Sequence, residues 1–496
     1  MRILGQIVSD RNELNYQNST VSFVLIVTME NNYYAITGGN GYFGIQNHIE
    51  EYFGVDLISK LINPDRIKYI KRKPLAGRII QEESVYKEYY NYNFDSSNWL
   101  KLSKEILGEM NHQGIQKELG IDLGKKFKIK LQGKSSFTIN KSLTLAELDT
   151  VLSKLHEVSQ REQKFILYRG FSEVNGKSLK AKLTFQLVGK LNSLYQKYIQ
   201  SEINFVESDV FLSYSDAREY LLCDSYLLSY RSFEPYETEE LDLLTVFSYL
   251  VQNGVIEFTE EILSDIRITG LDFDGNDIFN SRLKGYIFAE IRDGKELYCF
   301  IDQKWYIINQ QFIKRIDQQV SEIMSVSQNI SLSLPKWQIV NGKVETEDEY
   351  INKICHGKLV KMHRDHIIIS GRDKAEVCDV IDVRSDKVNF IFIKKGLGSS
   401  LRELFAQVRN SVELYMLDQH FKQKSLEKLF SKYEGTINDT LEHVTMAFVD
   451  ERIGRDIPLI NRLSTIIKLD LIHTIEFLQS LGINRSCFYE IEQIES

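Results

Sequence analysis

A regular succession of structural patterns near the C-terminal end constrains the fold of this 496-residue chain more than any other feature. An amphipathic segment, Thr346 to His356, predicts a short helix. Three β-rich runs follow it, and their two connections have the polar composition of tight turns. The runs are His366 to Ser370, Ala375 to Val383 and Val388 to Lys395. A long helical pattern, Leu401 to Lys424, and a strand pattern, Thr445 to Asp450, complete the predicted order α-β-β-β-α-β.

Acidic and basic side chains occur together in this segment. Glu376 and Asp379 lie on the second strand pattern, and Lys394 ends the third. Glu349 lies on the preceding helix, and Gln407, which we expect to orient the site, lies on the following one. Adjacent strands of one hairpin can present Asp379 and Lys394 at the same end of a sheet. Residues three apart on a regular strand face opposite ways, so Glu376 joins Asp379 only across a bulge or twist. On a regular strand, Glu349 is the better second ligand.

This pattern resembles the restriction-endonuclease-like folds of the PD-(D/E)XK type. The resemblance implies that Mg²⁺ or Mn²⁺ is held by Asp379 with Glu376 or Glu349. Lys394 would then contact the scissile phosphate and stabilise its developing negative charge. Ligation by oxygen atoms alone favours these hard ions over zinc. The chain departs from the pattern two residues before Lys394, where Phe392 replaces the expected acid.

A wider resemblance connects the chain with a sporadically distributed bacterial family of uncharacterised proteins. Three segments carry it: Glu376-Val-Cys-Asp379, Phe390-Ile-Phe-Ile-Lys-Lys395 and Ser399-Ser-Leu-Arg-Glu-Leu-Phe-Ala-Gln407. They are similar to the family's E-x-C-D-L segment, its strand ending in H-V-K, and its S-S-x-L-S-H-L-F-x-Q segment. Members occur on mobile elements and beside restriction or other phage-defence genes. The resemblance therefore implies an intracellular, defence-linked protein. Phe392 replaces the family's histidine, which leaves open a weakened or inactive protein.

Two basic features are candidates for contact with a nucleic-acid backbone. The stretch Arg66 to Arg78 carries six cations in thirteen residues, although a solvated strand-and-loop surface also explains it. Further cations lie beside the candidate site. The residues expected to contact the backbone are Lys71, Arg72, Lys73, Lys395 and Arg409. A formal net charge of -8 disfavours a protein coated uniformly for nucleic acid, but it leaves room for a local basic groove.

Other motifs are weaker. Gly39-Asn-Gly-Tyr-Phe-Gly44 matches G-x-G-x-x-G, but the second strand of a dinucleotide-binding unit does not follow it. The nine histidines show no zinc-ligand spacing. His363 and His366 are close to the C-terminal acids, but a turn and a strand start account for them about equally well.

The remaining sequence predicts a multi-domain α+β protein. We expect an N-terminal α+β region over residues 1–140, a middle α+β region over 141–335, and an endonuclease-like domain over 336–496. The five cysteines are scattered, which indicates reduced thiols and a cytoplasmic location. The N-terminus lacks a signal-peptide pattern, and no apolar run is long enough to span a membrane.

The function predicted from these features is action on nucleic acid in bacterial anti-phage defence, as a Mg²⁺- or Mn²⁺-dependent nuclease. DNA is favoured over RNA, a partner protein of a defence system is expected, and an oligomer is compatible with the sequence. Two alternatives stay open. One is a catalytically inactive sensor that binds nucleic acid or a phage protein. The other is a subunit that contacts only proteins.

Overall fold

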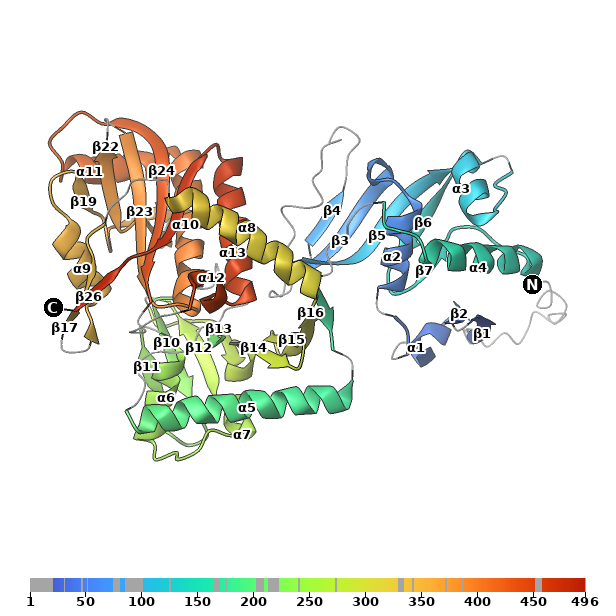
Figure 1. Ribbon diagram of the computed structural model, residues 1–496, viewed down its shortest axis with the longest axis horizontal. Helices are drawn as coiled ribbons and strands as arrows, with labels where there is room; N and C mark the ends of the chain where they lie inside the picture. Colours follow the sequence, from blue (N-terminus) through green and yellow to red (C-terminus); the bar gives the residue numbers. More distant parts are fainter. Residues whose placement is uncertain are drawn as a thin grey trace, which may run out of the picture. The chain divides into compact units, whose positions relative to one another are not determined.

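The computed structural model describes residues 21–30, 32–45, 48–50, 52–74, 81–84, 101–124, 126–164, 170–174, 176–201, 209–212, 223–239, 241–272, 274–328, 334–340, 343–370, 373–384, 387–450 and 457–495. These ranges form a mixed α+β protein with several separate sheets (Figure 1). Among their helices, none combines the length and apolar character of a membrane span. The chain divides into two compact units. One contains Met1–Arg72, Glu82–Tyr92 and Ser103–Leu167, and the other contains Lys73–Gln81, Asn93–Leu102 and Tyr168–Ser496. The three predicted regions stay a prediction.

The first unit centres on a five-stranded sheet of order β4-β3-β5-β6-β7. Helix α2 packs against β6 and β7, and α4 packs against α2. Strands β1 and β2 form a separate antiparallel hairpin. The elements are β1 (Phe23–Met29), β2 (Asn32–Gly38), α1 (Gly41–Ile45), α2 (Phe53–Leu61), β3 (Ile67–Pro74), β4 (Gln81–Ser84), β5 (Lys101–Asn111), α3 (His112–Leu119), β6 (Lys128–Gly133), β7 (Phe137–Ile139) and α4 (Leu145–Ser159). The predicted basic residues Lys71, Arg72 and Lys73 therefore lie on β3.

The second unit begins with two antiparallel sheets of order β11-β10-β12-β13 and β8-β16-β15-β14-β9. The elements are β8 (Phe171–Glu173), α5 (Lys177–Ile199), β9 (Val210–Leu212), β10 (Ser225–Ser229), β11 (Tyr236–Thr238), α6 (Leu243–Gln252), α7 (Glu260–Asp265), β12 (Arg267–Leu271), β13 (Asp277–Arg282), β14 (Ile287–Asp293), β15 (Glu296–Ile301), β16 (Lys304–Ile308) and α8 (Gln310–Gln328). Buried leucines of α5 recur every three or four residues, which gives the helix one apolar face. That face packs with Ile287 and Ala289 of β14, whereas Phe288 joins a different cluster with Ile316 of α8.

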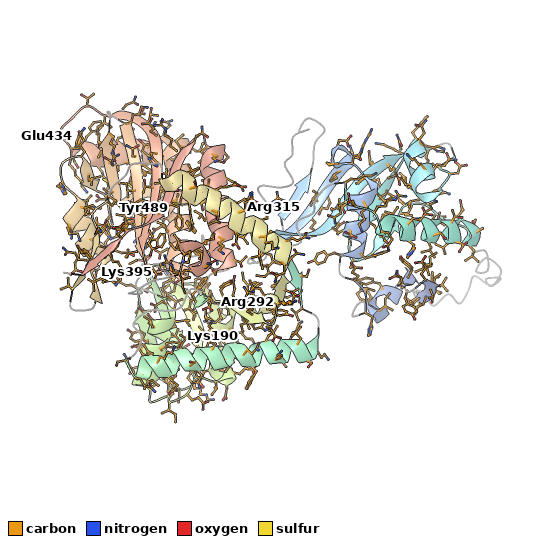
Figure 2. All side chains as sticks on the ribbon, viewed as in Figure 1. Lys190, Arg292, Arg315, Lys395, Glu434 and Tyr489 are labelled. Atoms are coloured by element: carbon orange, nitrogen blue, oxygen red, sulfur yellow. The ribbon has the colours of Figure 1, made fainter. Side chains whose placement is uncertain are left out.

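A mixed sheet of order β19-β22-β23-β24-β25 forms the C-terminal part of the second unit. Strand β22 is antiparallel to β19 and β23, while β23, β24 and β25 run parallel through helical crossovers. The elements are β17 (Trp337–Val340), β18 (Lys343–Val344), α9 (Glu347–Ile354), β19 (Leu359–Lys361), β20 (His366–Ser370), β21 (Asp373–Glu376), β22 (Val380–Arg384), β23 (Lys387–Lys395), α10 (Ser399–Leu417), α11 (Gln419–Phe430), β24 (Asn438–Val449), α12 (Leu459–Arg462), α13 (Thr465–Ser480), β25 (Arg485–Glu490) and β26 (Gln493–Glu495). Lys395 lies at the end of β23, and Glu434 precedes β24 at the opposite end of this sheet (Figure 2).

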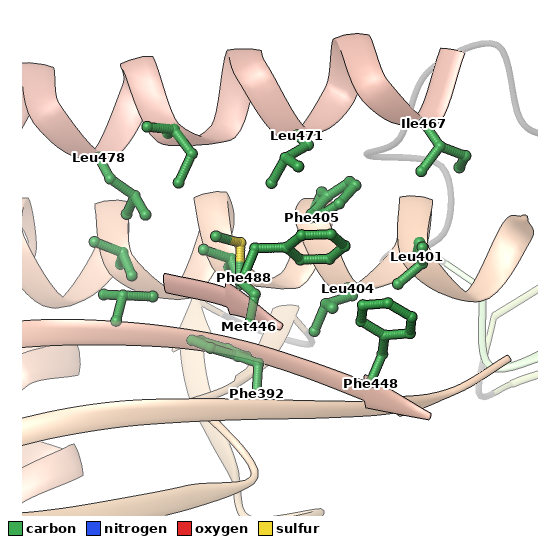
Figure 3. Packing of buried hydrophobic residues seen from close by; sticks show 14 of the residues in the cluster. Phe392, Leu401, Leu404, Phe405, Met446, Phe448, Ile467, Leu471, Leu478 and Phe488 are labelled. Carbon is green, nitrogen blue, oxygen red and sulfur yellow. The ribbon is translucent and has the colours of Figure 1, made fainter. Parts of the chain in front are cut away.

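Helices cover both faces of this sheet, which explains the almost uninterrupted apolar sequence of β23. Ile391 and Ile393 belong to the buried cluster that contains Tyr350 of α9. Phe390 and Phe392 point to the other face, where they join side chains of α10 and α13. Figure 3 shows this second layer, with Leu404 and Phe405 between the sheet and α13. The two faces therefore divide the side chains of β23 by alternation.

The predicted meander differs from the observed one in its first two strands. The first strand of the main sheet is β19, whereas the predicted run, β20, pairs with β21 in a separate hairpin. Strand β19 has three residues, too few to show an alternating pattern in the sequence. The predicted second strand is divided into β21 and β22. The carbonyl of Asp379 accepts hydrogen bonds from the backbone N–H groups of Met362 and His363, which interrupts regular strand pairing there.

Candidate metal centre

Three potential ligands meet where β21 gives way to β22. The ligand atoms of His363, Glu376 and Asp379 all lie within 4.8 Å of one another. Glu376 is the last residue of β21, and Asp379 immediately precedes β22. The break between these strands supplies the departure from regular geometry that brings two carboxylates three residues apart to the same side. His363 comes from the turn after β19.

Asp379 is the innermost member of the group, and both of its carboxylate oxygens have partners. Oδ1 lies 2.6 Å from Nδ1 of His363. Oδ2 accepts a hydrogen bond of 2.7 Å from the backbone N–H of Ile393 on β23. Because two neighbouring elements hold this side chain, its position is fixed by the sheet and by the turn after β19.

Glu376 and His363 have altered protonation equilibria. Burial, together with the nearby carboxylate of Asp379, raises the pKa of Glu376 to about 7. Its carboxylate also accepts a hydrogen bond from the backbone N–H of Arg364. Burial by itself lowers the pKa of His363, but the hydrogen bond to Asp379 and the surrounding carboxylates raise it above the ordinary histidine value. A buried and a half-buried carboxylate thus lie close together, and one imidazole offsets their repulsion.

The predicted ligand Glu349 lies outside this group. It closes the N-terminal turn of α9 in a capping box with Thr346, whose backbone N–H donates to Oε2 at 2.8 Å. Glu347 faces the site in its place. Its Oε1 accepts a hydrogen bond of 2.8 Å from the backbone N–H of Lys395, and its Oε2 lies 3.7 Å from Nζ of Lys394. Burial raises the pKa of Glu347.

Asp348 is the second residue of α9 that sequence reasoning missed. Its Oδ1 lies 3.5 Å from Nε2 of His363, the ring nitrogen that faces away from Asp379. Its Oδ2 lies 3.2 Å from the guanidinium of Arg364. A carboxylate beside the second nitrogen of a ligand histidine fixes the orientation of the ring.

Lys394 lies beside these acids, and carboxylates on two helices surround its charge. Its Nζ lies 3.0 Å from Oε1 of Glu403 on α10. Burial lowers the pKa of Lys394, but Glu347 and Glu403 more than compensate and raise it, so the amine stays protonated. Gln407 donates a hydrogen bond of 3.2 Å to the same oxygen of Glu403. Gln407 therefore contacts Glu403, which in turn contacts Lys394.

The remaining predicted residues have other surroundings. Lys395 directs Nζ toward the carbonyl of Val344 at 3.4 Å. Arg409 donates a hydrogen bond of 2.7 Å to Thr474 on α13. The side chains of Arg72 and Lys73 lie outside the described residues, as does Arg78. These residues stay predictions as contacts for a nucleic-acid backbone.

Phe392 is only 2% exposed and packs inside the apolar layer under α10 (Figure 3). The position two residues before Lys394 thus belongs to the core. Within the described residues, the carboxylates beside Lys394 come from α9, α10 and the β21–β22 break instead.

The donor set of His363, Glu376 and Asp379 fits a divalent cation. Mutual repulsion of two carboxylates that are largely shielded from solvent is relieved when a cation lies between them. The imidazole changes the expected ion, because carboxylates suit Mg²⁺ and Mn²⁺ while imidazole suits later transition metals better. Mn²⁺ accepts both ligand types and is therefore the better match of the two predicted ions.

Comparisons with known proteins give a family and no function. A family model described as "Family of unknown function (DUF6119)" matches residues 1–490. No curated protein and no solved structure matches the chain.

Proposed function

Because the chain belongs to this family of unknown function (DUF6119), we propose its function from the site: a metal-dependent phosphodiesterase that cleaves nucleic acid, DNA in preference to RNA, in bacterial anti-phage defence. One observation carries the proposal. The buried carboxylate of Asp379, the half-buried carboxylate of Glu376 and the imidazole of His363 converge within 4.8 Å, with the protonated Lys394 on the strand that hydrogen-bonds Asp379. A cation site beside a fixed ammonium suits the charge that develops on a phosphate during cleavage.

The order of elements supports an endonuclease-like core. Helix α9, strands β19, β22 and β23, helix α10 and strand β24 follow one another as α-β-β-β-α-β, with the β20–β21 hairpin and α11 as additions. The acid precedes the second of these strands, and the lysine lies near the end of the third. The PD-(D/E)XK resemblance implies an acid on the second strand and a lysine on the third, and Phe392 departs from it only at the acid two residues before that lysine.

Each residue has a distinct part in this proposal. His363, Glu376 and Asp379 would hold the ion, which when bound polarises a phosphate oxygen and activates water. Lys394 donates hydrogen bonds to the non-bridging oxygens of the phosphate. Glu347 and Glu403 keep Lys394 protonated and in place, and Gln407 orients Glu403.

A second candidate is a binding protein that recognises nucleic acid without cleaving it. The observation in its favour is that Lys394 already contacts two carboxylates, which leaves less of its charge for a phosphate. Either protein would act with a partner of a defence system.

Purified protein tested on labelled duplex DNA, single-stranded DNA and RNA separates the two candidates. We expect cleavage with Mn²⁺, weaker cleavage with Mg²⁺ and none with EDTA. Asp379→Asn and Lys394→Met should each lower the rate by about 100-fold or more. Asp277→Asn, which removes an exposed carboxylate at the start of β13, is the matched control and should keep the full rate.

The proposal fails if no substrate is cleaved with either ion while all variants retain the thermal midpoint of the wild type. Metal-independent binding that survives Asp379→Asn and Lys394→Met would then favour the binding protein. An absence of salt-dependent affinity for any nucleic acid would favour a subunit that contacts only proteins.

A further inference from the structure

The turn that carries His363 also holds an arginine in a backbone conformation that favours glycine. Arg364 has φ of 63°, in the left-handed region that residues with a Cβ atom rarely adopt. Its neighbours fix that conformation. The backbone N–H of Asp365 donates to the carbonyl of Met362 at 2.8 Å, and that of His366 donates to the carbonyl of Arg364 at 3.1 Å. Only main-chain atoms of Arg364 are needed for this turn.

The side chain of Arg364 contributes little to the fold. It is 73% exposed, and its ion pair to Asp348 at 3.2 Å is solvent-accessible. Exposed pairs of this kind add little stability. A glycine at this position would therefore make the same turn with less strain. An arginine held there at a conformational cost is a reason to look for a functional contact.

Exposure increases outward from the candidate metal centre toward this arginine. The exposed fractions of the side chains rise in the order Asp379 (7%), His363 (11%), Glu376 (21%), Asp348 (38%) and Arg364 (73%). The centre therefore meets solvent on the side of Asp348 and Arg364. A ligand that approaches the three inner residues from this side contacts the guanidinium of Arg364 first.

Three lysines lie around the same turn. Lys361 precedes it on β19, with Nζ 3.6 Å from Asp348. Lys428 of α11 and Lys432, just beyond that helix, both contact Asp365, the residue after Arg364. Lys432 also donates a hydrogen bond of 2.9 Å to the carbonyl of Lys361. We call these four cations, Arg364 with the three lysines, the Arg364 rim. Two carboxylates, those of Asp348 and Asp365, pair with them, so the cations are in excess.

We propose that the Arg364 rim binds the phosphates of a nucleic-acid backbone beside the metal centre. This inference rests on the proposed phosphodiesterase function and identifies the residues that hold its substrate. The planar guanidinium of Arg364 matches two oxygens of one phosphate, and the lysines contact neighbouring phosphates as point charges. Binding replaces the pair between Arg364 and Asp348, which leaves Asp348 to orient His363.

A pair of glycine variants tests the inference in the full-length protein. Arg231 also has a positive φ, 51°, and an exposed side chain paired with Glu261. It lies between β10 and β11, in a different sheet. Arg364→Gly and Arg231→Gly thus remove the same charge and relieve the same kind of backbone strain. Affinity for fluorescein-labelled duplex and single-stranded DNA and for RNA is measured with Ca²⁺ over a series of salt concentrations, together with the thermal midpoint.

We expect both variants to unfold at or above the wild-type temperature, because glycine suits both positions. Arg364→Gly should weaken binding by about tenfold and lower the log–log salt slope by about one, while Arg231→Gly should leave both unchanged. Arg364→Lys, which keeps the charge and loses the planar fork, should bind with intermediate affinity.

Equal affinity of Arg364→Gly and Arg231→Gly overturns the inference, and it leaves the proposed function intact if the wild type binds and cleaves. A thermal midpoint that falls only for Arg364→Gly also overturns it, since the side chain would then be structural. Absence of salt-dependent binding by the wild type overturns both the inference and the proposed function.

Discussion

Glu347 and Glu349 differ in environment because an α-helix turns by about 100° for each residue. Two positions along α9 therefore change which side of the helix a carboxylate occupies. Glu347 faces Lys394 and the end of β23, whereas Glu349 folds back on the first turn of its own helix. The sequence contained a signal for this difference. Thr346 followed three residues later by Glu349 is the pattern of a capping box.

This difference gives a prediction for matched variants. Glu347→Gln should lower the cleavage rate by about tenfold or more, because Lys394 loses one of its two carboxylate partners. Glu349→Gln should leave cleavage unchanged, since its side chain caps the start of α9. Cleavage rates and Mn²⁺ affinity of the two variants, measured side by side, check this. Equal losses in both would show that Glu347 has no special role.

Asp379 and Lys394 were predictable from sequence because their spacing depends on one short hairpin. Glu376 was predictable as a candidate, but the strand break that turns it toward Asp379 depends on backbone bonds to Met362 and His363. His363 stood out in the sequence only by its closeness to these acids, and a turn explained it about equally well. Phe392 marked a departure from the endonuclease pattern, and its burial shows why an acid there would be isolated in an apolar layer.

At the scale of elements, the strand β23 could be predicted from the sequence, whereas the order of the strands beside it in the sheet could not. Strand β19 is short, and its place beside β22 depends on long-range pairing.

Contacts between distant elements also include a buried carboxylate. Glu290 of β14 accepts a hydrogen bond of 2.7 Å from the backbone N–H of Thr465 at the start of α13. Unsatisfied N–H groups at a helix start attract a carboxylate.

The contact between Glu290 and α13 predicts a pH dependence of stability. Burial raises the pKa of Glu290 to about 7, with Lys468 and Asp209 as the charged neighbours. The folded protein therefore holds this proton more tightly than the unfolded chain. The stabilisation that this tighter proton binding gives the folded protein is complete below about pH 4.5. It is lost as the pH rises through about 7. The linked change is up to about 3 kcal/mol.

Urea unfolding of the wild type and Glu290→Gln at pH 5 and pH 8 checks this. Relative to the variant, the wild type should lose stability between these pH values, because glutamine stays neutral. Subtracting the variant removes the titration of all other groups. A constant difference between the two proteins over this range would contradict the assignment.

At the scale of the whole molecule, the hydrophobic core around the C-terminal sheet includes residues from outside the predicted domain 336–496. One buried cluster contains Phe392 and Phe405 of that segment together with Phe288 of β14 and Ile316 and Val320 of α8. Helix α8 packs against β25 and α13. Its residues precede position 336, so a division at that point cuts through a continuous apolar core.

This continuity predicts how fragments behave. Residues 336–496 expressed alone should expose the apolar surface that α8 and β14 cover, and should not unfold cooperatively. Residues 168–496 retain those elements and should unfold in one transition. Because the proposed ligands His363, Glu376 and Asp379 lie next to strands that share this core, only the longer fragment should bind Mn²⁺ with the affinity of the full chain. Calorimetry of both fragments measures whether each unfolds cooperatively, and Mn²⁺ titration compares their affinities with that of the full chain. A shorter fragment that folds cooperatively and binds Mn²⁺ normally would show that the metal centre is independent of α8, and that the predicted boundary at 335 marks a true domain.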